Sequence, residues 1–151
     1  MTRAVTFPDG ITAATPPDVT PGSQESFPIL DNQSVYTPLL NTDGDQLVLD
    51  ESDCVSAFIE YELARSNLTD SFIQMGRINA IKDPTTGWMI VPGNYIGSDL
   101  IQEDDDTIDN DQEIILSIDS TTGEVTYKSG ALTGGVDYVG NLILIITRIF
   151  I

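Results

Sequence analysis

The chain contains no histidine and only one cysteine, Cys54. Without histidine, Ser-His-Asp and Cys-His catalysis are excluded, and the commonest zinc ligand is missing. A single cysteine excludes a disulfide within the chain. Cys54 begins an apolar, strand-like run, where a buried and unreactive thiol is more common than a nucleophile. The sequence therefore predicts a protein that is not an enzyme, with no catalytic residue, no cofactor and no bound metal.

Basic residues are also scarce. Six Lys and Arg stand against 24 Asp and Glu, which gives a formal net charge of -18 over 151 residues. Such a charge repels phosphate backbones and anionic membrane surfaces, so neither nucleic acid nor a membrane is an expected partner. Residues 1–19 lack a basic segment followed by an apolar run, so we expect no secretory signal and synthesis in a cytoplasm.

The acidic run at residues 103–111 is the one cluster that suggests ion binding. Closely spaced carboxylates can supply the oxygen ligands that calcium requires. An EF-hand loop needs a glycine at its sixth position, whereas a loop starting at Asp104 has Asp109 there. We interpret residues 103–111 as a solvated loop and keep a cation site as the alternative.

Aromatic residues could form a platform on which a sugar stacks. Trp88 follows a predicted hairpin turn, where exposure would be compatible with such a role, and Tyr61, Tyr95, Tyr127 and Tyr138 could extend the platform. A core position for Trp88, against an opposing sheet, is the interpretation we prefer. Glycan binding through Trp88 and the tyrosines remains the alternative.

The first 50 residues differ from the rest in their proline content. Six of the eight prolines lie there: Pro8, Pro16, Pro17, Pro21, Pro28 and Pro38. Proline fixes φ and lacks a donor, which excludes a regular helix or an inner strand. The stretch nevertheless has more apolar residues than a solvated linker needs. It is predicted to be an extended docking arm that orders on a neighbour or on its own domain, with candidate docking residues Val5, Phe7, Ile11, Phe27 and Ile29.

From Leu47 onward the apolar residues alternate with period two, as in half-buried strands. Strands are predicted at 55–65, 71–82, 88–91, 113–119 and 123–129, with turns at 83–87 and 120–123. Short strands separated by turn signals indicate an all-β domain. We predict an antiparallel, jelly-roll-like β-sandwich over residues 51–151, preceded by the arm at residues 1–50.

Residues 141–151, NLILIITRIFI, form an almost unbroken apolar run at the end of the chain. The run is too short for a transmembrane helix and predicts a central strand that is covered on both faces. One face should fill the sandwich and the other should contribute to a contact between subunits. The candidate interface residues are Leu142, Leu144, Ile146, Ile149, Phe150 and Ile151.

The order of these strands resembles a small β-sandwich domain that is common in virion proteins of tailed bacteriophages. The resemblance covers Val55 to Ile151, about two-thirds of the chain. Such domains open with a strand of pattern I-E-Y-S-I-x-R, as in residues 57–65, and continue with a G-x-L-x-I strand, as in residues 75–81. An acidic loop follows, and an L-x-Y-x-I-x-R-x-F strand closes the domain. The closing strand of this chain, residues 142–150, is more apolar than usual.

The resemblance implies a structural protein of the virion, made in the host cytoplasm and often trimeric. No repeat or heptad precedes residue 55, so a long fibre shaft is not expected. A short arm and one sandwich fit best a head decoration or cement protein that forms a homotrimer and binds the major capsid protein or other virion proteins. The alternative is a tail-fibre or tail-spike tip that binds host surface glycan.

Overall fold

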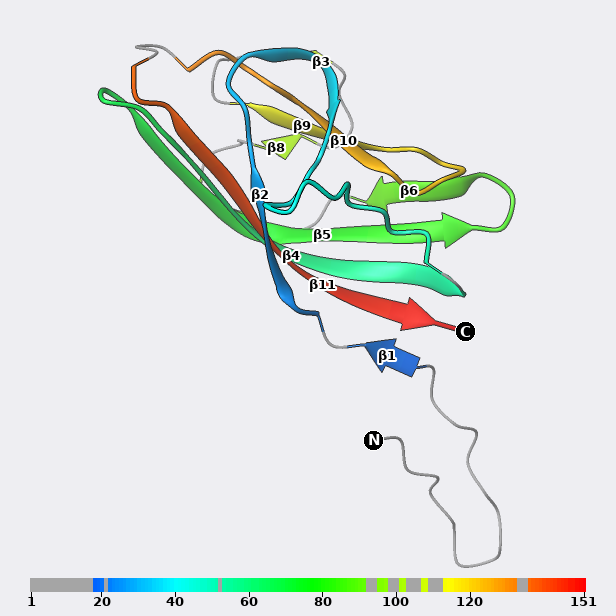
Figure 1. The fold of residues 1–151 in the computed structure, drawn as a ribbon. Helices are drawn as coiled ribbons and strands as arrows, with labels where there is room; N and C mark the ends of the chain where they lie inside the picture. Colours follow the sequence, from blue (N-terminus) through cyan, green and yellow to red (C-terminus); the bar gives the residue numbers. More distant parts are fainter. Residues whose placement is uncertain are drawn as a thin grey trace, which may run out of the picture.

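The computed structural model describes residues 18–20, 22–51, 53–91, 95–97, 101–102, 107–108, 113–132 and 136–151. The described residues form eleven strands and no helix, arranged as two sheets (Figure 1). The prediction of an all-β fold is therefore confirmed, whereas the jelly-roll connectivity stays a prediction. In this part of the chain no helix is long and apolar enough to cross a membrane.

The larger sheet contains seven strands. They are β1 (Asp18–Thr20), β2 (Gln24–Pro28), β4 (Cys54–Ser66), β5 (Ser71–Asp83), β6 (Gly87–Val91), β7 (Tyr95–Gly97) and β11 (Val139–Phe150). Their order is β1-β11-β4-β5-β6, with β2 also paired to β11 and β7 also paired to β5. All of these pairs are antiparallel. The predicted strands at 55–65, 71–82 and 88–91 correspond closely to β4, β5 and β6.

The smaller sheet contains β3 (Gln33–Pro38), β8 (Ile101–Gln102), β9 (Ile114–Ile118) and β10 (Val125–Ser129). Its order is β3-β10-β9-β8. The β3–β10 and β9–β10 pairs are antiparallel, whereas the short β8–β9 pair is parallel. The predicted hairpin between 113–119 and 123–129 is confirmed as β9 and β10.

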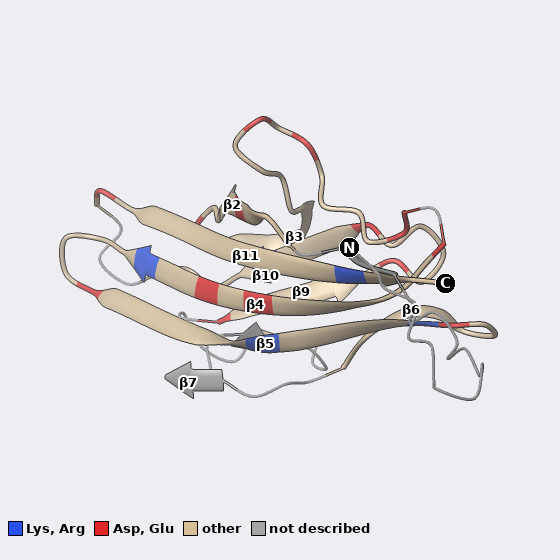
Figure 2. Cartoon of the chain, turned by 90° about the horizontal axis from the view of Figure 1, so that it is seen from below, with Lys and Arg blue, Asp and Glu red and all other residues tan. Residues whose placement is uncertain are grey.

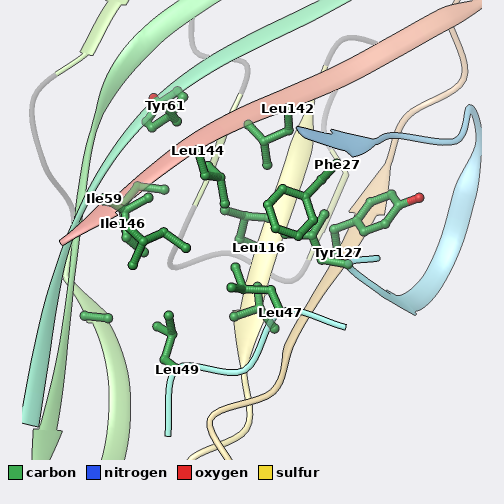
Figure 3. Close-up of a cluster of buried hydrophobic side chains, with 14 of the residues drawn as sticks. Phe27, Leu47, Leu49, Ile59, Tyr61, Leu116, Tyr127, Leu142, Leu144 and Ile146 are labelled. Atoms are coloured by element: carbon green, nitrogen blue, oxygen red, sulfur yellow. The ribbon is translucent and has the colours of Figure 1, made fainter. Parts of the chain in front are cut away.

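The hydrophobic core lies between the two sheets (Figure 3). It follows from the period of the strands, since every second side chain of a strand points to the same face. The larger sheet contributes alternate residues of β4 and β11, and the smaller sheet contributes Leu116 and Tyr127. Leu47 and Leu49, from the segment between β3 and β4, pack into the same cluster.

Two turns with the same sequence pattern, Asp-x-Thr-Thr-Gly, connect β5 to β6 and β9 to β10. In each, at residues 83–87 and 119–123, the aspartate Oδ1 accepts hydrogen bonds from the two threonine backbone N–H groups. Each closing glycine has a positive φ, which glycine adopts without strain. The backbone N–H of Trp88 donates to the carbonyl of Ser120 over 2.8 Å, so the two turns lie side by side and link the sheets.

The predicted boundary between an arm at 1–50 and a sandwich at 51–151 is wrong for residues 24–49. β2 pairs with β11 and β3 pairs with β10, so both strands belong to the sandwich. Phe27 and Ile29 are buried in its core and are not free to dock on another protein. The prolines allow this because Pro28 and Pro38 end their strands, and each strand lies at the edge of its sheet. Val5, Phe7 and Ile11 lie outside the described residues.

Candidate interaction surface

The terminal strand β11 lies inside the larger sheet, between β4 on one edge and β1 and β2 on the other. The prediction of a central strand is confirmed. Leu142, Leu144 and Ile146 are buried in the core of their own chain, so their assignment to a subunit interface is wrong. Phe150 is partly buried and packs against the same core.

The other face of β11 is not covered by the described residues. Ile145 is exposed, while Ile143 and Ile149 are only partly buried. Of the remaining interface candidates, Ile149 belongs to this face, and Ile151, beyond the end of the strand, is 88% exposed. Among the described residues only one face of β11 is covered, and the contact between subunits on its other face stays a prediction.

Three further strands extend this surface. Directly opposed residues of adjacent strands share a face, so the register assigns β4, β5 and β6 residues to the same side as Ile145. We call this side the outer face of the larger sheet. Its exposed large apolar side chains are Phe58, Ile73, Met75, Ile81, Met89, Val139 and Ile145. So many exposed apolar side chains on one face of a sheet are typical of an interaction site.

Charged residues are rare on the outer face, although the chain is strongly acidic. Along β4, β5, β6 and β11 the only acidic residues are Glu60, Glu62 and Asp83, and Asp83 lies at the end of β5. Figure 2 shows the three long strands almost entirely in tan, with most of the red acidic positions in the surrounding loops. The apolar surface is thus surrounded by negative charge.

One cation lies within this surface. Glu60 of β4 opposes Arg77 of β5, and Arg77 Nη2 lies 3.9 Å from Glu60 Oε1. Both side chains are largely exposed, so this ion pair is accessible from outside. Ile145 opposes Glu60 on the other side, which places the ion pair beside exposed apolar residues.

Ile149 is the one residue of this face of β11 among the predicted interface residues; Ile145 and the outer-face residues of β4 and β5 were not predicted. A signal was present, because successive apolar residues such as Phe72 and Ile73 occupy both faces of β5. A strand with one solvated face should carry polar residues at alternate positions. The departure from strict alternation was a sign of a second apolar surface.

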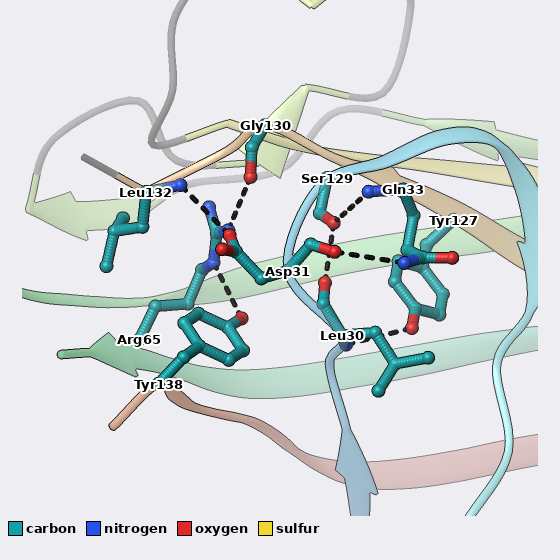
Figure 4. Close-up of polar contacts among 9 residues, drawn as sticks. All are labelled: Leu30, Asp31, Gln33, Arg65, Tyr127, Ser129, Gly130, Leu132 and Tyr138. Carbon is teal, nitrogen blue, oxygen red and sulfur yellow. Dashed lines mark hydrogen bonds and ion pairs between the residues drawn. The ribbon is translucent and has the colours of Figure 1, made fainter. Parts of the chain in front are cut away.

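A polar network joins several segments at the end of the sandwich opposite the paired turns (Figure 4). The guanidinium of Arg65 is buried and donates to Asp31 Oδ1, to the hydroxyl of Tyr138 and to the carbonyl of Gly130. Burial raises the pKa of Tyr138, although its bond with Arg65 acts in the opposite direction. Each partner comes from a different segment, so the network fixes the loops around it.

An open cleft of about 550 Å³ lies at the paired turns, lined in part by Asp53, Lys82 and Thr86. Beside it, Lys82 Nζ lies 2.6 Å from Asp50 Oδ1, which also accepts a hydrogen bond from the indole N–H of Trp88. The bonds from Lys82 and then Trp88 lower the pKa of Asp50. These groups bind one another and so hold the segment before β4 against β5 and β6.

The residues considered for chemistry lie mostly in the core. Trp88 is 2% exposed, which confirms the prediction of a core tryptophan. Tyr61 and Tyr127 are buried as well. Cys54 is buried, and desolvation raises the pKa of its thiol, as expected for an unreactive cysteine.

The possible cation site at residues 103–111 lies outside the described residues, except for Thr107 and Ile108. The side chain of Tyr95 is not described either. Among the side chains that the structure does describe, no group of three or more acidic or thiol ligands is placed to hold a metal ion.

No protein-family model, curated protein or solved structure is similar enough to the chain to count as a match.

Proposed function

We propose that the protein is a non-enzymatic structural protein of a bacteriophage virion, which decorates the head and forms a homotrimer. The observation that carries this proposal is the apolar, charge-poor outer face of the larger sheet in a chain of net charge -18. Monomeric proteins rarely expose an apolar face of this size to water, whereas an oligomer buries it between subunits.

The order of strands supports the virion assignment. The β4 and β5 hairpin, the β9 and β10 hairpin and the closing strand β11 follow one another as in the phage β-sandwich domain that the sequence resembles. The acidity suits a protein displayed at high density, because acidic outer loops keep neighbouring particles apart.

The partners in this proposal are other copies of the chain and the major capsid protein. The docking segment is reduced to residues 1–17, because residues 24–49 belong to the sandwich. Val5, Phe7 and Ile11 remain its candidate anchors. A peptide that binds in an extended form adds backbone hydrogen bonds and places alternate side chains in pockets.

The alternative, a tail-tip domain that binds glycan, requires exposed aromatic rings. The burial of Trp88, Tyr61 and Tyr127 removes most of the stacking platform on which that alternative depended. We therefore favour the decoration protein.

The proposal is tested by adding the purified full-length chain to capsids that lack decoration proteins. We expect saturable attachment, seen by electron microscopy as density on the head, and its loss when residues 1–17 are deleted. Sedimentation equilibrium of the free chain should give the mass of a trimer, three times 16.4 kDa. Failure to bind capsids, together with density only at the tail tip of intact particles, would contradict head decoration.

A further inference from the structure

We infer that the outer face of the larger sheet is the contact between copies of this chain, and that Arg77 of one copy pairs there with Glu62 of its neighbour. The inference rests on the proposed homotrimer and names the surface that holds it together. Three observations favour a second copy as the occupant: the distribution of charge, the size of the face, and the charged groups within it.

The distribution of charge restricts where two copies can meet. Each copy carries a net charge of -18, so most approaches bring carboxylates together. The outer face carries Glu60, Glu62, Arg77 and, at the end of β5, Asp83; three negative charges and one positive sum to -2. Two copies that meet through this face therefore repel one another far less than their total charges imply, and its apolar residues supply the attraction.

The face is large enough for a stable contact. The strands β4, β5, β6 and β11 contain 13, 13, 5 and 12 residues. At about 3.3 Å per residue and about 4.8 Å between strands, they cover about 680 Å² in projection. Side chains make the accessible area larger than the projected one. The face thus approaches the roughly 800 Å² that each partner contributes to a standard protein interface.

The charged groups explain how such a contact tolerates ionised side chains. A buried charge is costly unless it is paired and hydrogen-bonded. Glu60 has Arg77 beside it, whereas Glu62, one row further along β4, takes part in none of the ion pairs among the described residues. A guanidinium has five N–H donors in a fixed fork, so Arg77 can serve Glu60 of its own copy and Glu62 of another.

The first experiment changes the apolar part of the face. Phe58→Glu places a carboxylate at a side chain that is 54% exposed, next to Asn79 and Thr147. We expect this variant to sediment as a monomer at concentrations at which the unchanged chain is a trimer. The matched control is Val35→Glu on β3 of the smaller sheet, which is 73% exposed and should leave the trimer intact.

The second experiment exchanges the charges. Arg77→Glu and Glu62→Arg should each raise the dissociation constant of the assembly at least about tenfold, because each puts like charges opposite one another. The double variant R77E/E62R should return to within about threefold of the unchanged chain. Restoration by the second substitution also shows that the single variants fail by repulsion and not by misfolding.

The outcomes separate this inference from the proposed function. A trimer that withstands both Phe58→Glu and Arg77→Glu would overturn the inference and leave the homotrimer standing on another surface. Loss of assembly in both single variants without recovery in the double variant would overturn the pairing of Arg77 with Glu62. A chain that is monomeric at all concentrations would contradict the homotrimer itself.

Discussion

Arg65 and Asp31 form an ion pair inside the sandwich, with Arg65 Nη2 3.1 Å from Asp31 Oδ1. The Arg65 side chain is fully buried, and Asp31 also accepts a hydrogen bond from the backbone N–H of Leu132. The pair thus joins the segment between β2 and β3 to the end of β4 and to the segment after β10. The chain has only six basic residues, and the guanidinium of one of them, Arg65, is buried in contacts within the chain.

Removing the acid of this pair should destabilise the fold. Asp31→Ala leaves a buried guanidinium without its carboxylate, and we expect the free energy of unfolding in urea to fall by about 3 kcal/mol. The control is Glu60→Ala, which breaks the exposed pair with Arg77 and should cost less than about 1 kcal/mol when unfolding is measured at a protein concentration low enough to give monomers. Equal effects of the two substitutions would contradict the structural role of the Arg65 network.

The long strands and tight turns of the domain could be predicted from the sequence because their signals are local. Period-two alternation defines β4, and the Asp-x-Thr-Thr-Gly pattern defines the turns at 83–87 and 119–123. The position of residues 24–49 could not be predicted in this way. β2 and β3 are fixed by partners far along the chain, and their prolines indicate only that they are not inner strands.

The candidate surface was predictable only in part, for a related reason. β11 has more isoleucine residues than the core of one sandwich needs, and this excess predicted a second contact surface. Which residues share its free face depends on register, and register sets Glu60 and Arg77 beside Ile145. That register is a property of the paired sheet, which no single segment contains.

Truncation of two neighbouring residues of β11 should lower the stability by different amounts. Leu144→Ala removes buried core volume and should lower the free energy of unfolding by about 3 kcal/mol. Ile145→Ala, on the outer face, should cost about 1 kcal/mol or less when unfolding is measured at a protein concentration low enough to give monomers. A larger cost for Ile145 than for Leu144 would mean that the two faces of β11 have been assigned the wrong way round.

The paired turns should make stability dependent on pH in the acidic range. Hydrogen bonds from the backbone N–H groups of Thr86 and Thr85 lower the pKa of Asp83 below 3.8, and those of Thr122 and Thr121 do the same for Asp119. Because these pKa values are lower in the folded chain than in the unfolded one, the stabilisation is present above pH 3.8. It is lost as the pH falls below 3.8 through the folded values.

The double variant D83N/D119N tests this dependence. Its melting temperature should fall less than that of the unchanged chain between about pH 5 and pH 2, since asparagine does not titrate. The control is Asp45→Asn, an exposed aspartate of another turn, which should follow the unchanged chain. Identical curves for the double variant and the unchanged chain would exclude these two carboxylates as sources of the pH dependence.

Trp88 is the only tryptophan, so its fluorescence reports directly on the buried position of its ring. In the folded chain we expect little quenching by acrylamide, and strong quenching together with a red shift of the emission in urea. Trp88→Phe keeps an aromatic ring but loses the indole N–H bond to the Asp50 carboxylate. It should lower the free energy of unfolding by about 2 kcal/mol, since hydrogen bonds to charged groups contribute about 1.5–3 kcal/mol. A ring that acrylamide quenches freely in the folded protein would contradict this burial. It would also restore the stacking surface that glycan recognition at a tail tip requires, and would weaken the case for a decoration protein.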